Sequence, residues 1–210
     1  MSGGVIKSGI TLAAIAAICT LLVAATFQLT AERIAANEQA WLERSLEPAL
    51  SGVIFEGSVT GSKLEIPPPH DLPGNDTAMI YRVFAEDAPV AALFAVTARD
   101  GYAGPIRILV GIGVDGTVTG IRIVDHRETP GLGDRIDQSR SDWVYQFDGR
   151  SLADPVEARW LLEVDGGEFD QLTGASVTPR AVINAIRDTL IYFDAHRDEI
   201  FLLPASEEQL

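Results

Sequence analysis

A run of hydroxyl side chains lies immediately before a predicted helix near the end of the chain. Residues 168–182 read EFDQLTGASVTPRAV, in which Thr173, Ser176 and Thr178 lie two or three residues apart. Free backbone N–H groups and the helix dipole stabilise an anion at a helix N-terminus. The Gly-Ala pair before Ser176 is small enough to let a ligand approach the backbone closely. The pattern therefore favours a phosphate-binding turn with a hydroxyl group in reach.

Helix capping is a simpler interpretation of the same residues. Pro179 suits the first turn of a helix, because its missing N–H would have no partner there. Thr178 then becomes the natural N-cap, with its hydroxyl accepting a hydrogen bond from a backbone N–H. Ser176 lies two residues upstream of this cap. Because hydroxyl-rich helix starts are common, the stretch alone does not decide between capping and phosphate binding.

A second candidate cluster follows directly from a predicted strand. Residues 126–136 read HRETPGLGDRI, in which a proline and two glycines predict a tight, rigid loop with its backbone N–H groups turned outward. Leu132, exposed between the glycines, suits an apolar face laid against a flat ring. A plain turn is the alternative. The candidate binding residues of this loop are Glu128, Thr129, Gly131, Leu132 and Gly133.

A third glycine-bearing loop, DGYAGPI, occupies residues 100–106. Its Tyr102 could line the same pocket as the other two clusters or simply pack against the domain. The loop joins two predicted strands, so its position depends on the sheet.

Alternating apolar residues predict the elements that position these loops. Over 105–114 the apolar side chains alternate on one face, as in a half-buried strand. Asp115-Gly116 then predicts a tight hairpin turn with positive φ at both positions. An amphipathic helix over 179–200 would cover the sheet. The predicted fold is α+β with a mainly antiparallel, twisted sheet, and its strands are expected at residues 79–86, 89–98, 105–114, 117–126 and 158–164.

The N-terminal part of the chain carries a long apolar run. Residues 10–29 contain no charge, and a helix of that length spans roughly 30 Å, the thickness of a bilayer core. A cleaved signal peptide or a buried helix is the alternative, although the apolar run of a signal peptide is shorter. Lys7 precedes the run and all 30 acidic residues follow it. The N-terminus is therefore expected in the cytoplasm and the body outside, in the periplasm of a bacterium.

Composition excludes several classes of function. The net charge of −14 argues against nucleic acid as a partner and against docking on anionic lipid. The single cysteine, Cys19, lies in the apolar run, so the outer domain has no disulfide, thiolate nucleophile or iron–sulfur cluster of its own. The three histidines show no metal-binding spacing, and no metal is expected.

The three clusters together resemble a known family. TGAS preceded by Asp170 resembles the flavinylation motif of proteins that carry FMN on a hydroxyl group through a phosphodiester. DGYAGPI and ETPGLGD occur upstream in the order typical of the RnfG proteins of the Rnf electron-transport complex. A related component of the sodium-pumping NADH:quinone reductase, NqrC, shares the domain. The resemblance runs from residue 10 to about residue 195.

This resemblance implies a single-span protein whose soluble domain holds covalent FMN outside the cytoplasmic membrane. A flavin transferase would use FAD and release AMP, with Asp170 in its recognition motif. The attachment site maps to Ser176, where the family usually has threonine, and Thr178 is the fallback. The implied FMN-binding residues are Tyr102, Glu128, Thr129, Gly131, Leu132, Gly133, Thr173, Gly174, Ala175 and Thr178.

The family also implies a function for the whole chain. The complex would move electrons between reduced ferredoxin and NAD, coupled to ion transport, with the other Rnf proteins, RnfA, RnfB, RnfC, RnfD and RnfE, as partners. This chain would be an electron carrier without catalytic residues or a substrate of its own. The alternatives are a membrane-anchored scaffold with a vestigial flavin site and a free-standing periplasmic reductase.

The chain is accordingly expected to have five parts. These are a cytoplasmic N-terminus at 1–9, a transmembrane helix at 10–29, a helical stalk at 30–47, a periplasmic FMN-binding domain at 48–200 and a tail at 201–210.

Overall fold

The computed structural model describes residues 47–50, 53, 61–86 and 88–202, together with six helical residues between Leu12 and Thr20. The contacts within the chain define two compact units, Met1–Leu42 and Glu43–Leu210. Within the described part of the chain, no helix is both long and apolar enough to cross a membrane. Most of the predicted span at 10–29, and the predicted stalk up to residue 46, lie outside the described residues.

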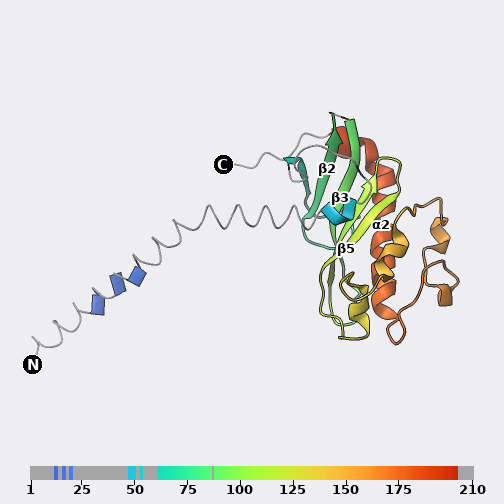
Figure 1. Cartoon of the computed structure of the whole chain (residues 1–210). Coiled ribbons are helices and arrows are strands. Elements are labelled where there is room, and N and C mark those ends of the chain that lie inside the picture. Colours follow the sequence, from blue (N-terminus) through green and yellow to red (C-terminus); the bar gives the residue numbers. More distant parts are fainter. Residues whose placement is uncertain are drawn as a thin grey trace, which may run out of the picture. The chain divides into compact units, whose positions relative to one another are not determined.

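The larger unit is built on one sheet whose five antiparallel strands follow one another in chain order. Each strand pairs with its neighbour in sequence, which confirms the predicted α+β class with an antiparallel sheet. The first strand is short and was not predicted. The strands are β1 (Lys63–Ile66), β2 (Ala78–Ala85), β3 (Ala88–Ala98), β4 (Ile106–Gly113) and β5 (Val118–Asp125) (Figure 1).

The turn between β4 and β5 is longer than predicted. The Gly113 N–H donates to the Thr117 carbonyl, and the Gly116 N–H donates to the Gly113 carbonyl, both at 2.8 Å. Gly116 has a φ of 87°, whereas Asp115 keeps a negative φ. The connection is therefore a three-residue loop that ends in a left-handed glycine. The Asp115 carboxylate accepts from the N–H and the hydroxyl of Thr117, and these bonds lower the pKa of Asp115.

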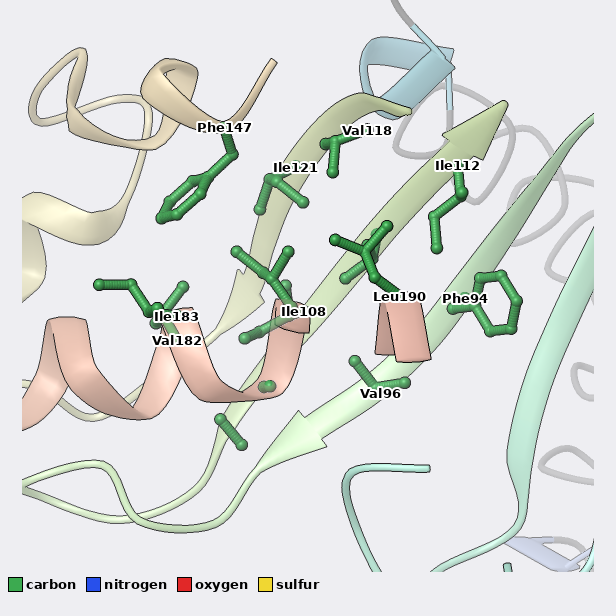
Figure 2. Packing of buried hydrophobic residues seen from close by; sticks show 14 of the residues in the cluster. Phe94, Val96, Ile108, Ile112, Val118, Ile121, Phe147, Val182, Ile183 and Leu190 are labelled. Carbon is green, nitrogen blue, oxygen red and sulfur yellow. The ribbon is translucent and has the colours of Figure 1, made fainter. Parts of the chain in front are cut away.

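Helix α2 (Val177–Leu202) packs along one face of the sheet (Figure 1). Figure 2 shows Val182, Ile183 and Leu190 of this helix pointing toward sheet residues that include Val96 and Ile108, and all five side chains are buried. Burying a side chain of this size stabilises the fold by about 1.5–3 kcal/mol. The amphipathic pattern over 179–200 thus predicted the helix correctly.

A short 3-10 helix, η1 (Glu47–Leu50), covers the opposite face. Gly111 faces it, while the next residue, Ile112, belongs to the core cluster under α2; neighbouring residues of a strand point to opposite faces. The Thr119 hydroxyl donates to the Ala49 carbonyl at 2.8 Å. Nearly all of β4 is buried as a result. The strand predicted over 105–114 is therefore confirmed, but the prediction that it is half-buried was wrong.

Residues 158–164 do not form the predicted strand. They lie across two 3-10 helices, η5 (Glu157–Arg159) and η6 (Glu163–Asp165). The Trp160 indole N–H is within 3.1 Å of the carbonyls of Ser151 and Pro155. Its ring lies 4.8 Å from that of Phe169. Trp160 is therefore part of an aromatic cluster beside the sheet, and this tertiary packing overrides the strand propensity of the stretch.

Gly111→Ala should destabilise the larger unit. A Cβ at this position would lie 1.9 Å from the Ala49 carbonyl oxygen, so η1 would have to move off the sheet. We expect the free energy of unfolding to fall by at least about 2 kcal/mol, measured by chemical denaturation. Gly61→Ala is the matched control, because a Cβ there meets nothing within 4 Å. Equal stabilities of the two variants would contradict the role of η1.

Candidate functional site

Three segments meet at one end of the sheet. The loop at 99–105 joins β3 to β4, the loop at 126–132 leaves β5, and the segment at 173–178 leads into α2. Together they line an open pocket of about 450 Å³, within the size range of small-molecule sites. The pocket is lined by Tyr102, Glu128, Thr129, Leu132, Gly133, Gly174, Ala175, Ser176, Val177 and Thr178.

The carboxylate of Glu128 joins the three segments. Its Oε2 accepts a hydrogen bond from the Thr178 hydroxyl, and its Oε1 accepts from the Ala103 N–H at 3.0 Å. Glu128 is only 4% exposed, so these bonds replace most of its water contacts. A Cβ at Gly101 or Gly133 would lie 2.9 or 2.8 Å from one of its oxygens. The two glycines therefore make the room that the buried carboxylate needs.

Thr178 is not the N-cap that the sequence predicts. Helix α2 begins at Val177, so Thr178 is already its second residue. Its side chain is buried and donates to Glu128. Ser176 takes the cap position, since its carbonyl accepts the Arg180 N–H at 3.4 Å. The sequence placed the cap at Thr178 because of Pro179, but a proline is tolerated throughout the first turn of a helix, where N–H groups have no intrahelical partner.

Ser176 is exposed at the first turn of α2 and lines the pocket. Within the described residues its hydroxyl makes no hydrogen bond, so it is available to an incoming group. The helix N-terminus beside it favours a negatively charged substituent. Arg180, one turn further on, is held by Asp165 through bonds of 2.6 and 2.9 Å, which lower the pKa of Asp165.

The loop after β5 differs from the prediction in one respect. Its backbone N–H groups point inward instead of outward: Gly131 donates to the Asp134 carboxylate at 2.7 Å, and Leu132 donates to the Thr129 carbonyl at 3.1 Å. The loop is therefore rigid but offers these N–H groups to no ligand. The acceptor of the Gly131 N–H is the buried side chain of Asp134.

Apolar side chains surround the pocket. Leu132, Val177 and Tyr102 are 42%, 46% and 72% exposed, which is unusual for large apolar residues gathered in one place. Gly174 has a φ of 82°, and a Cβ there would lie 3.0 Å from Leu132. Leu132 thus lies close over the glycine, and a larger residue would displace it. This combination of an apolar rim and an exposed hydroxyl fits a flat aromatic ring joined to a phosphate.

Some predicted residues lie outside this pocket, and one pocket residue was missed. Thr173 and Gly131 belong to its segments but do not line it. Asp170 is exposed on the segment before Thr173 and is not a lining residue either. Val177 does line the pocket. Its apolar side chain at an exposed helix start could have indicated this, had the helix been predicted to begin there.

Comparison with known proteins defines the class of this domain. Residues 101–191, which contain every residue that lines the pocket, match the family described as FMN-binding domain. Residues 1–48 match the RnfG N-terminal region.

Full-length relatives define the family. A protein of Shewanella baltica is 40% identical and covers 99% of this chain and 98% of its own length. One of Escherichia coli K12 is 40% identical over 96% and 97%, and one of Vibrio vulnificus is 39% identical over 97% and 96%. Each is named as the G component of an ion-translocating oxidoreductase complex. The chain belongs to this family, which is the RnfG family that the sequence motifs resemble.

Glu128→Ala should loosen the whole site. It leaves the buried Thr178 hydroxyl and the part-buried Ala103 N–H without their acceptor, and an unpaired buried group costs about 1–3 kcal/mol. We expect the free energy of unfolding to fall by about 2 kcal/mol or more, measured by denaturant titration. Glu157→Ala, at an exposed glutamate, should change it by less than about 0.5 kcal/mol. A Glu128 variant as stable as this control would disprove the bridging role.

Proposed function

We propose that the chain is the electron-relaying RnfG component of an ion-translocating ferredoxin:NAD oxidoreductase complex and carries FMN bound covalently through Ser176. The observation that supports this most directly is the exposed Ser176 hydroxyl at the N-terminus of α2, on the wall of an apolar pocket within the matched FMN-binding domain. FMN would supply reversible electron transfer, and the chain would supply its position.

The site residues would divide the binding of FMN between them. The Ser176 oxygen would hold the phosphate, where the helix dipole favours its negative charge. Leu132, Val177 and Tyr102 would contact the isoalloxazine ring through their exposed apolar surfaces. Glu128 would act indirectly, because its hydrogen bonds fix the segments that carry these residues.

Attachment requires a separate flavin transferase and FAD. The Ser176 oxygen would form a bond to the phosphorus on the flavin side of FAD, and the bond between the two phosphates would break. AMP would leave with the bridging oxygen, and the serine proton would pass to solvent. The step is a phosphoryl transfer, so it leaves the oxidation state of the flavin unchanged.

The proposed relay role rests on the expected location of the domain and on its composition. Residues 48–200 would lie in the periplasm, with residues 10–29 as the span and the short N-terminus in the cytoplasm. NADH and ferredoxin are cytoplasmic, so electrons would reach this flavin only from other proteins of the complex in the membrane. The sequence after Cys19 contains no cysteine, so a partner protein would have to bring any iron–sulfur centre close to the ring.

Ser176→Ala should abolish covalent flavin. We expect peptide mass spectrometry of the full chain, made with its flavin transferase, to find the FMN mass on the peptide containing Ser176. Ser176→Thr is the matched control, because it keeps the hydroxyl and should keep the flavin. Covalent flavin that persists in Ser176→Ala would refute the assignment and point to Thr178, the fallback. No flavin on the wild-type chain would instead favour a scaffold role.

A fusion experiment tests the proposed orientation. A reporter that is active only after export should be active when fused after Leu210, because the domain ahead of it would be periplasmic. The same reporter fused after Lys7, before the apolar run, should be inactive. An inactive fusion at Leu210, together with normal amounts of fusion protein in the membrane, would place the domain in the cytoplasm and contradict the relay scheme.

A further inference from the structure

Asp170 is held in place by its backbone while its side chain stays free. Its N–H donates to Oε1 of Gln146 at 2.7 Å, and its carbonyl accepts from the indole N–H of Trp143 at 2.7 Å. The side chain is exposed, and within the described residues its carboxylate makes no hydrogen bond or ion pair. Both backbone polar groups of Asp170 are thus bound by side chains of a single element, η4 (Trp143–Phe147).

The residues around Asp170 add to this fixation. Phe169 is buried, with its ring 4.8 Å from the rings of both Phe147 and Trp160. Leu172 is buried as well. The chain is therefore anchored on both sides of Asp170, and the exposed carboxylate projects from a rigid base.

The side chains of η4 are themselves tied together. The Gln146 amide N–H donates to the Trp143 carbonyl at 2.9 Å, which fixes its oxygen toward Asp170. The Trp143 ring packs edge-to-face on Phe147 with centroids 5.3 Å apart, and it is only 8% exposed. Water can satisfy the backbone N–H and carbonyl groups of an exposed segment. Two side-chain hydrogen bonds to the backbone of Asp170 are therefore not required for hydrogen bonding alone.

We infer that Trp143 and Gln146 are positioning residues for flavin attachment, holding Asp170 where the flavin transferase recognises it. This inference rests on the proposed function, in which Asp170 is the recognition residue and Ser176 the acceptor. A recognition side chain on a fixed backbone loses less conformational entropy when the partner binds. Small displacements of a reacting group can also lower a rate by up to about a hundredfold.

Two variants each remove one of the hydrogen bonds to the backbone of Asp170 with little change in side-chain shape. Trp143→Phe keeps an aromatic ring against Phe147 but deletes the indole N–H. Gln146→Met keeps the length of the side chain but deletes the acceptor of the Asp170 N–H. Tyr145→Phe is the matched control, because Tyr145 lies on the same 3-10 helix with its side chain 51% exposed. Asp170→Asn removes the recognition charge itself.

The experiment measures the rate of covalent flavin attachment. Full-length chain purified without flavin is incubated with flavin transferase and FAD, and kcat/KM for the chain as substrate is determined for each variant. We expect Trp143→Phe and Gln146→Met each to lower kcat/KM by about tenfold or more, and Tyr145→Phe to leave it unchanged. Thermal unfolding of each variant identifies any loss that is due to unfolding.

A double-mutant cycle separates positioning from a general structural role. If Gln146 acts through Asp170, Asp170→Asn combined with Gln146→Met should be no slower than Asp170→Asn alone, whereas independent effects would multiply. Wild-type attachment in Gln146→Met and Trp143→Phe, or multiplied losses in the double variant, would overturn the inference and leave the proposed function intact. A wild-type chain that accepts no flavin would overturn both.

Discussion

The buried carboxylate of Glu128 is the interaction on which the geometry of the site depends. It accepts hydrogen bonds from a residue of each of the other two segments that form the pocket, Ala103 and Thr178. Removing a carboxylate from water is expensive unless hydrogen bonds replace the lost hydration. The three segments must therefore stay together for Glu128 to be buried, and the burial of Glu128 in turn keeps them together.

The sheet explains why these segments can meet. In an antiparallel meander, the connection from β3 to β4 and the exit from β5 lie at the same end, as the pairing of Arg107 with Asp125 shows. The N-terminus of α2 reaches that end because the helix packs along β3 and β4. Segments about 75 residues apart in sequence are thus brought together by ordinary strand order and helix packing.

The sequence predicted the elements better than the contacts between them. The strands β2 to β5 and helix α2 follow from apolar periodicity, which is a local signal. The covering of Gly111 by η1 and the burial of Trp160 depend on residues distant in sequence, so no local pattern indicated them. Thr178 illustrates the limit within the site: its hydroxyl suggested a cap, but its partner is Glu128, 50 residues earlier. Most of the residues that the motifs indicated line the pocket, but the motifs did not predict the contacts that these residues make.

The shape of the pocket gives a physical reason for a covalent bond in the proposed function. Leu132, Val177 and Tyr102 remain between 42% and 72% exposed, so they offer an open apolar surface and not an enclosed cavity. A ring lying on such a surface buries only part of its area. Its contacts therefore contribute little binding free energy to offset the loss of translational freedom. A bond through Ser176 removes that cost by making the contact intramolecular. In the proposed function, the same openness would leave one side of the ring accessible to a partner protein, as an electron relay requires. The open pocket and the covalent bond would then serve one function.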